Sequence, residues 1–461
     1  MTTDELREQL LMAPKNGYET ITEAQRKEMN DYAARYMGFM DECKTEREST
    51  AYAIREAEKL GFVPFTPGMV LTAGDKVYYN NRDKAIILAV IGSESLAKGA
   101  NICAAHMDSP RLDLKPNPLY EDTEIAFLKT HYYGGIKKYQ WPTVPLALHG
   151  VVYRKDGSMV TVTIGEDDND PILMVTDLLI HLASDQMQKT LAKGITAEQL
   201  NVLVGTEPIE GEGADLVKLN VMKLLNEKYG LIEADFQSAE LTVVPAGRSR
   251  EAGLDRSLIA AYGHDDRSCV YAELDALFAL EVPSKTAVCI FADKEEIGSI
   301  GISGMQSHFF EHFMGGLCDV QGVKLEDCFA NSFCLSADVA MAFDPNFAEV
   351  HDKRNNAFLN HGVAIMKYTG GGGKSRASDA SAEAMGHVRS TFDNAGVLWQ
   401  MATLGKVDQG GGGTVAAYMA NRNIVTVDAG VPVLNMHAPM ELVSKLDSYM
   451  TMLACKAIYE A

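Results

Sequence analysis

The 461-residue sequence predicts an α/β protein in which a mixed, helix-covered sheet is interrupted by an inserted β-rich domain. One observation is a set of short apolar runs without helical periodicity, at 85–91, 102–105, 287–292, 333–337 and 424–427. Such runs are typical of strands that are buried on both faces of a sheet. The other is the stretch from 109 to 250, where β-branched segments such as 160–164 follow an Asp156-Gly157 hairpin signal.

The length also favours more than one domain, since single hydrophobic cores stop growing near ~250–300 residues. We expect residues 1–108 and 251–461 to form two segments of one α/β domain, with helices such as 269–280 and 440–459 between or after its strands. We expect residues 109–250 to form the β-rich insertion. Near the N-terminus, Thr22 with Gln25 and Thr45 with Glu48 match the capping-box pattern that begins a helix.

The charge balance excludes some partners. The chain has 42 basic and 63 acidic residues, a formal charge of −21, whereas nucleic acids and anionic membranes bind basic surfaces. No segment reaches the ~18 consecutive apolar residues of a membrane span, and the N-terminus lacks signal-peptide features. The eight cysteines form no Cys-x-x-Cys pair, so we expect buried, reduced thiols and a cytoplasmic protein.

Metal-binding residue types lie at or near the ends of several predicted strands or at the start of a helix. They are His106 with Asp108, Asp265, Glu295 with Glu296, Asp338 and, ten residues after the last run, His437. In open α/β sheets, ligand sites lie beyond the carboxyl ends of the strands, so these groups can converge. Neutral imidazole and carboxylate suit zinc, and cobalt or manganese accept the same ligands. Of two adjacent glutamates, one can bind a metal while the other acts as general base.

Each motif is weak by itself, because an isolated His-x-Asp or Glu-Glu pair is usually a solvated surface feature. The ordered set favours a pair of metal ions about 3.5–4 Å apart that share a water and a carboxylate. The run from Gly370 to Ser375 is similar to a phosphate-binding loop. That motif needs glycine where Tyr368 stands, so we reject nucleotide binding.

Taken in order, these motifs resemble those of the aspartyl aminopeptidases, di-zinc exopeptidases with a zinc-exopeptidase-like α/β/α domain. The match also includes the segments 131–135 and 141–150. The resemblance implies that Asp265 bridges two metals, with His106 and Glu296 at one and Asp338 and His437 at the other. It implies that Glu295 is the general base and that Asp108 orients His106. It also implies that the insertion assembles tetrahedral dodecamers, in which His181 reaches a neighbouring active site; a histidine on a helix face is the alternative.

Two glycine-containing loops and one lysine are the candidates for substrate binding. Lys374 and Gly412 match loops near the family's substrate pocket. Glycines in these loops either allow backbone amides to approach a substrate closely or simply form a turn. In a chain of charge −21, Lys374 is the candidate cation for an acidic substrate side chain. We therefore expect a metallo-aminopeptidase that acts on peptides, plausibly on N-terminal Asp or Glu. The alternatives are a related di-metal amide hydrolase, such as a deacylase, and a non-catalytic, self-assembling metal-binding scaffold.

Overall fold

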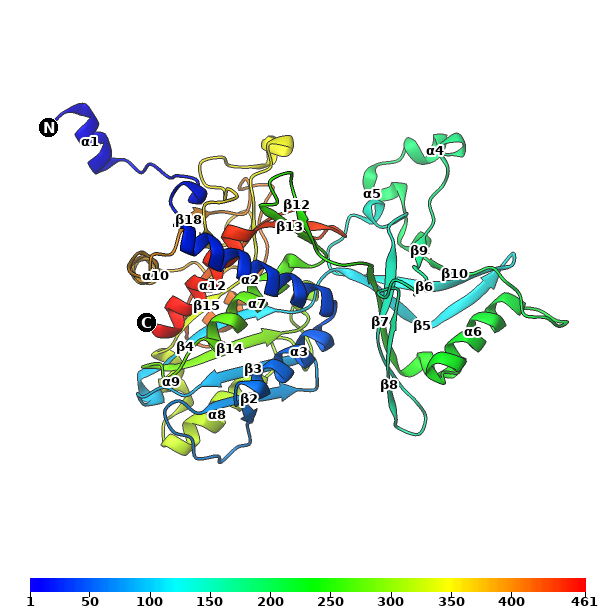
Figure 1. Cartoon of the computed structure of the whole chain (residues 1–461), viewed down its shortest axis with the longest axis horizontal. Helices are drawn as coiled ribbons and strands as arrows, with labels where there is room; N and C mark the ends of the chain where they lie inside the picture. Colours follow the sequence, from blue (N-terminus) through cyan, green and yellow to red (C-terminus); the bar gives the residue numbers. More distant parts are fainter.

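A nine-stranded mixed sheet forms the centre of the larger of two lobes in the computed structural model, which describes residues 1–461 (Figure 1). Its four central strands, β14, β4, β15 and β19, run parallel, and β3 and β17 flank them antiparallel. In spatial order the strands are β1 (Val63–Pro64), β2 (Lys76–Asn81), β3 (Ala85–Val90), β14 (Thr286–Ala292), β4 (Ala100–His106), β15 (Phe333–Ser336), β19 (Val425–Gly430), β17 (Val363–Met366) and β18 (Trp399–Ala402). The predicted α/β fold with a mixed sheet is confirmed.

Helices cover both faces of this sheet, because its strands are apolar on both sides. Along β3, Ile86 and Leu88 pack into one core while Ile87 and Ala89 pack into the other, as the alternation of side chains in a strand requires. The first core lies under α2 (Glu23–Glu42), α3 (Glu46–Lys59), α7 (His264–Phe278), α10 (Ala382–Ala395) and α12 (Lys445–Glu460), and the second under α8 (Phe309–Gln321), α9 (Leu325–Ala330) and α11 (Ala416–Ala420). The capping boxes predicted at Thr22 and Thr45 begin α2 and α3.

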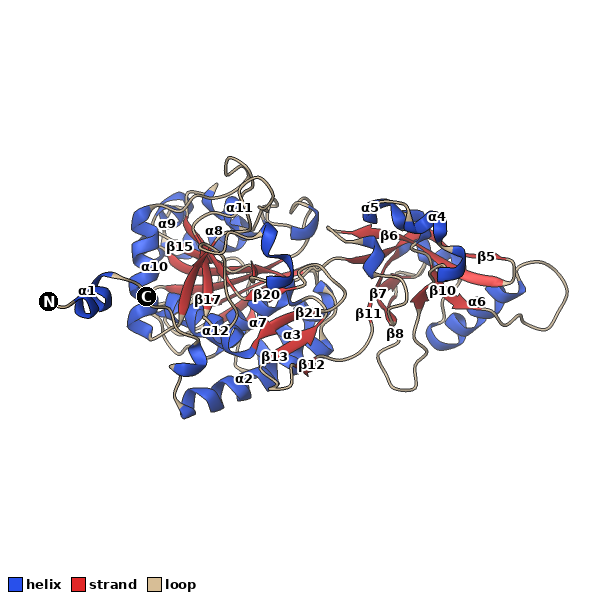
Figure 2. Ribbon diagram, turned by 90° about the horizontal axis from the view of Figure 1, so that it is seen from above, coloured by secondary structure: helices blue, strands red, loops and turns tan.

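The smaller lobe is built on a seven-stranded antiparallel sheet whose strands all lie between Arg111 and Pro245. The hairpin predicted at Asp156-Gly157 joins two of them. In spatial order the strands are β8 (Met159–Ile164), β7 (Leu146–Tyr153), β11 (Ala239–Pro245), β5 (Arg111–Asp122), β6 (Ile125–Tyr133), β10 (Val202–Gly205) and β9 (Met174–Val175); the helices are α4 (Ser184–Met187), α5 (Leu191–Gly194) and α6 (Leu216–Tyr229). Both views place this lobe beside the nine-stranded sheet (Figures 1 and 2).

A third, five-stranded sheet was not predicted from the sequence. It contains β12 (Arg250–Ala252), β13 (Leu258–Ala261), β21 (Glu441–Ser444), β20 (Pro432–Leu434) and β16 (Ala340–Met341). The prediction of one closing helix over 440–459 was wrong at its start, because 441–444 pair with β13 as strand β21 before α12 begins. Pairing with a strand more than 170 residues distant is a tertiary effect that a local pattern does not contain.

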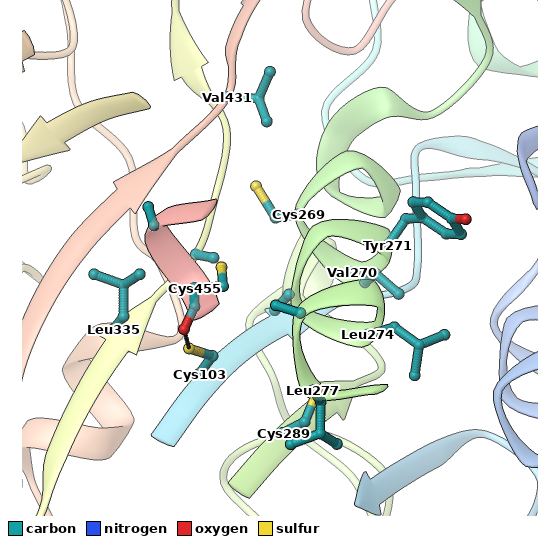
Figure 3. Close-up of a cluster of buried hydrophobic side chains, with 14 of the residues drawn as sticks. Cys103, Cys269, Val270, Tyr271, Leu274, Leu277, Cys289, Leu335, Val431 and Cys455 are labelled. Carbon is teal, nitrogen blue, oxygen red and sulfur yellow. Dashed lines mark hydrogen bonds between the residues drawn. The ribbon is translucent and has the colours of Figure 1, made fainter. Parts of the chain in front are cut away.

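All eight cysteines are buried free thiols, as predicted. Four of them, Cys103, Cys269, Cys289 and Cys455, lie in the core between α7, α12 and the central strands (Figure 3).

The N-terminal helix α1 (Thr3–Leu10) buries no residue and extends away from the body in both views (Figures 1 and 2). None of the helices has the length and apolar composition needed to cross a bilayer.

A charged seam joins the two lobes along α3. Arg111 of β5 pairs with Glu46 at 2.8 Å, and Arg47 of α3 pairs with Glu240 of β11 at 2.6 Å. The buried His149 of β7 lies between two carboxylates, with Nδ1 2.8 Å from Glu48 and Nε2 3.0 Å from Glu166. Although burial opposes protonation, these two contacts raise the pKa of His149 to about 9, so that both ring nitrogens donate at neutral pH.

We predict that His149 makes the stability of the protein decrease at alkaline pH. Its pKa is raised from 6.5 to about 9 in the folded state. The contribution is therefore fully present below pH 6.5 and is lost as the pH rises through about 9; it amounts to roughly 3 kcal/mol. Urea unfolding at pH 6 and pH 10 should show a smaller decrease for His149→Gln than for the wild type. His308→Gln, at an exposed histidine, is the control and should retain the wild-type decrease.

Candidate metal centre

The carboxyl ends of the central parallel strands bring the predicted metal-binding residues together. His106 is the last residue of β4, the turn Glu295–Ile297 follows β14, and Asp338 follows β15. In register, Ala292 at the end of β14 lies beside His106. Asp265 comes from the first turn of α7 and His437 from the loop between β20 and β21. Parallel neighbours end at the same edge of the sheet, which is why residues far apart in sequence meet here.

Asp265 lies at the centre of the cluster. One of its oxygens is 3.3 Å from Nε2 of His106, and the other is 3.1 Å from Nε2 of His437. The atoms able to bind a metal form two groups that share Asp265: His106, Asp265 and Asp338, and Asp265, Glu296 and His437. The grouping taken from the family resemblance, which paired His106 with Glu296 and Asp338 with His437, was wrong, because Asp338 lies on the His106 side and Glu296 on the His437 side.

The outer nitrogen of each histidine is held by a backbone carbonyl. Nδ1 of His106 lies 2.9 Å from the carbonyl oxygen of Asp108, and Nδ1 of His437 lies 2.8 Å from that of Gly135. A carbonyl can only accept, so Nδ1 carries the proton in both rings and Nε2 is left facing Asp265. This is the tautomer in which a histidine binds a metal through Nε2.

The carboxylate of Asp108 mainly holds the turn that carries the two glutamates. It accepts hydrogen bonds from the backbone N–H groups of Glu295 and Glu296, both at 3.1 Å, and from the Tyr133 hydroxyl at 2.8 Å. Its distance to Nδ1 of His106 is longer, 3.4 Å. The structure therefore places the carbonyl of Asp108 against His106 and its carboxylate against the 295–297 turn.

Two buried carboxylates support the site, and one of them, Glu441, was not identified from the sequence. Glu441 of β21 accepts the N–H groups of Asp265 at 3.0 Å and of His437 at 2.6 Å, and Asp266 accepts the N–H of His106 at 3.2 Å. Nothing in the local sequence marks Glu441, because its partners are brought to it by the third sheet.

The cluster carries more negative charge than its surroundings neutralise. Mainly through burial, the pKa of Glu295 is raised to about 7 and that of Glu441 to about 8. Burial also raises the pKa values of Glu296 and Asp338. Oε1 of Glu296 is buried without a hydrogen-bond partner. A buried carboxylate oxygen without a donor is costly unless a cation is bound to it. The donor set and this free oxygen therefore fit divalent metal ions.

The cluster lines one end of a cavity of about 620 Å³. Besides the metal-binding residues, its walls include Arg376, Gly411–Thr414, Met366 and Tyr418. Gly412, a predicted substrate-binding residue, is part of this wall. The two glycine-rich loops touch each other: a Cβ on Gly411, whose φ is +120°, would lie 2.2 Å from the Cα of Gly371. Glycine at these positions thus permits close packing of one loop on the other.

Two of the predicted substrate-binding residues do not line this cavity. Lys374 lies over the ring of Tyr368, pairs with Asp379 at 3.1 Å and lines an adjoining cavity of about 460 Å³. Arg376, two residues on, is exposed, makes no ion pair and is the basic residue that lines the same cavity as the metal-binding cluster. His181 is exposed in a short turn before α4, on the smaller lobe.

A larger groove of about 1350 Å³ lies between α2 and the β12–β13 hairpin and shares no lining residue with the cavity of the cluster.

The chain matches proteins of one family over nearly its whole length. The family model described as aminopeptidase I zinc metalloprotease (M18) matches residues 39–459. A probable M18 family aminopeptidase 1 of Clostridium acetobutylicum is 50% identical over 451 residues, which are 96% of this chain and 97% of that protein. A probable M18 family aminopeptidase 1 of Borrelia garinii is 44% identical over 97% of this chain and 100% of that protein.

Solved structures agree with these matches. The crystal structure of an M18 family aminopeptidase from Thermotoga maritima has a TM-score of 0.94 and 43% identity, over 97% of this chain and 99% of that one. The structure of the S. cerevisiae mApe1 dodecamer has a TM-score of 0.76 over 93% of this chain and 96% of that one. At 19% identity, that structure is similar in fold alone.

Proposed function

The chain belongs to the M18 family of zinc aminopeptidases, and we propose that it hydrolyses the N-terminal peptide bond of peptides with two metal ions and Glu295 as general base. The observation that carries this proposal is the pair of ligand groups that share Asp265 beside Glu295 in one cavity. Zinc is the metal of the family, and the ligands also suit cobalt or manganese. A cavity rich in carboxylates also favours a substrate with a free, protonated amine over an N-acylated one.

Each side chain has a defined task in the proposed reaction. His106, Asp265 and Asp338 hold one ion, and Asp265, Glu296 and His437 hold the other. When bound, the ions polarise the scissile carbonyl and lower the pKa of water. Oε2 of Glu295, 4.0 Å from Nε2 of His106, accepts a proton from the attacking water and later donates it to the leaving amine. Asp108 holds the backbone of the 295–297 turn, so that Glu295 and Glu296 keep their separate directions.

We predict that Glu295→Gln lowers kcat by about 10²–10⁴-fold, the usual value of general acid–base catalysis, and leaves two metals bound per chain. The amide keeps the size of the side chain but cannot accept the proton. Turnover of aminoacyl amides and elemental analysis of the same preparation measure the two effects. Glu281→Gln, at an exposed glutamate, is the control. A metal-loaded Glu295→Gln protein with near wild-type turnover would exclude this role, and cleavage of N-acyl amino acids alone would favour the deacylase.

Acidic N-terminal residues are the proposed preference, with Arg376 rather than Lys374 as the recognising cation. Arg376 lines the cavity of the metal-binding cluster without a carboxylate partner, whereas Lys374 already pairs with Asp379. A guanidinium can bind a substrate carboxylate through two parallel hydrogen bonds. The neighbouring wall from Gly411 to Thr414 offers backbone groups to the rest of the substrate.

We predict that Arg376→Gln lowers kcat/KM for Asp and Glu amides about 10- to 100-fold, the equivalent of roughly 1.5–3 kcal/mol for a charged hydrogen bond. The same change should affect leucine amides much less. A panel of fluorogenic aminoacyl amides measures this, with Lys374→Gln as the matched control that keeps most of the activity. If the wild type prefers leucine amides, or if Lys374→Gln shows the larger loss, the assignment to Arg376 is excluded.

We also propose that residues 109–250 form an oligomerisation domain; a yeast protein of similar fold is a dodecamer. The smaller lobe exposes a run of large apolar side chains, with Ile180 and Leu182 each 68% exposed and Met187 and Leu191 each 71% exposed. Apolar groups gathered in this way are typical of a protein–protein interface. His181 lies within this run, so association there is what would bring it to the site of a neighbouring subunit.

We predict that Leu182→Glu reduces the mass of the assembly, because a charge at an apolar contact is costly when it is buried. Light scattering after gel filtration measures the mass. Gln188→Glu adds the same charge at an exposed polar residue of the same segment and should leave the assembly intact. An unchanged mass for Leu182→Glu would place the interface elsewhere.

A further inference from the structure

The end of strand β6 extends from the smaller lobe into the metal-binding cluster of the larger one. Tyr133 is the last residue of β6, and the two glycines after it complete a segment of three residues that we call the 133–135 arm. Tyr133 is buried, with 7% of its surface exposed. The arm belongs to the lobe expected to serve assembly, yet it contacts residues on both sides of the candidate metal centre.

On one side, the Tyr133 hydroxyl donates to Oδ2 of Asp108 at 2.8 Å. The same carboxylate accepts the N–H groups of Glu295 and Glu296, so Tyr133 is the third donor to the group that holds the glutamate turn. The two N–H groups bind one oxygen each, and the hydroxyl is a second donor to Oδ2, which further restricts rotation of the carboxylate. Without the hydroxyl, Asp108 has one constraint fewer against turning toward Nδ1 of His106, 3.4 Å away.

On the other side, the carbonyl oxygen of Gly135 accepts the Nδ1 proton of His437 at 2.8 Å. Space at this contact is limited: a Cβ on Gly135 would lie 3.3 Å from Nδ1 of His437. A Cβ on Gly134 would lie 3.2 Å from the Cβ of Glu296, and the φ of Gly134 is +74°. The arm therefore needs glycines both for its backbone conformation and for its approach to two metal-binding residues.

The arm is itself anchored at the seam between the lobes. The guanidinium of Arg111 lies 4.2 Å from the centre of the Tyr133 ring and pairs with Glu46 of α3 at 2.8 Å. Arg111 and Tyr133 are also opposite each other in the β5–β6 pairing. The ring is thus held by strand pairing, by a cation–π contact and by an ion pair to the larger lobe, so its hydroxyl has a defined position.

We propose that the 133–135 arm positions the metal centre, with Tyr133 acting through Asp108 on the glutamate turn and the Gly135 carbonyl acting on His437. The larger lobe then does not complete a competent site by itself, and the smaller lobe is part of the catalytic unit as well as an assembly module. Tyr133 is a positioning residue, since it does not line the cavity and its hydroxyl binds Asp108. The inference rests on the proposed di-metal function.

The test compares Tyr133→Phe with Tyr132→Phe in the full-length, zinc-loaded protein. Tyr132 is the adjacent tyrosine, 38% exposed, and is the matched control. Zinc release into a chromogenic chelator, kcat and KM for an aminoacyl amide, and the thermal midpoint are measured on the same preparations. For Tyr133→Phe we expect about 10-fold faster zinc release and about 10-fold lower kcat, the lower end of the effects seen when partners of metal ligands are removed, with KM changed less than about two-fold.

If Tyr133→Phe matches Tyr132→Phe in zinc release and kcat, the proposal is overturned. A lower thermal midpoint with unchanged zinc release also overturns it, because that result assigns Tyr133 a structural role only. Should Tyr133→Phe not fold, Gly134→Ala replaces it in the test, and normal zinc release together with normal kcat in that variant would overturn the proposal. If the wild type binds zinc but cleaves no amide, the proposed function is rejected. The positioning proposal is still tested in that case, because the rate of zinc release can be compared between the variants without any turnover.

Discussion

The shared carboxylate of Asp265, held between the Nε2 atoms of two histidines, is the interaction on which the rest of the site depends. Each histidine faces a different oxygen of Asp265, and each has its other nitrogen bound to a backbone carbonyl. That arrangement requires β4, the start of α7 and the loop after β20 to meet at one point. The parallel pairing of the central strands and the third sheet around β21 both serve this requirement.

Burying several carboxylates together is unfavourable, and the protein treats them in two ways. Asp108 and Glu441 accept backbone N–H groups with both of their oxygens, which satisfies them within the protein. Glu296 instead keeps a buried oxygen without a donor, and burial raises its pKa. The first kind of carboxylate fixes the geometry, and the second kind is available to cations. This division explains how acidic residues so close in space serve different purposes.

The two lobes depend on each other through residues that are neither apolar core nor metal ligands. The ion pairs of Arg111 and Arg47 and the doubly bonded His149 fasten the smaller sheet to α3. From the same sheet the 133–135 arm reaches Asp108 and His437. A change at the seam can therefore reach the metal centre without touching a ligand. The effect follows from rigid packing of β5 and β6 between the seam and the site.

Apolar runs and capping residues are local signals, so the α/β class and the buried strands could be predicted from the sequence. The sequence also indicated which residues could bind metal, because His, Asp and Glu stand at or near the ends of the predicted strands. The grouping of these residues around Asp265 could not be predicted, because it depends on the strand order and register that place Asp338 beside His106 and Glu296 beside His437. The tertiary structure likewise revealed the contacts of Glu441, Tyr133 and Gly135, and it showed that Arg376 lines the cavity whereas Lys374 does not. The hydrogen-bond partner of Tyr133 lies 25 residues away in the sequence, and that of Gly135 lies 302 residues away. Local sequence patterns do not predict contacts between residues so far apart.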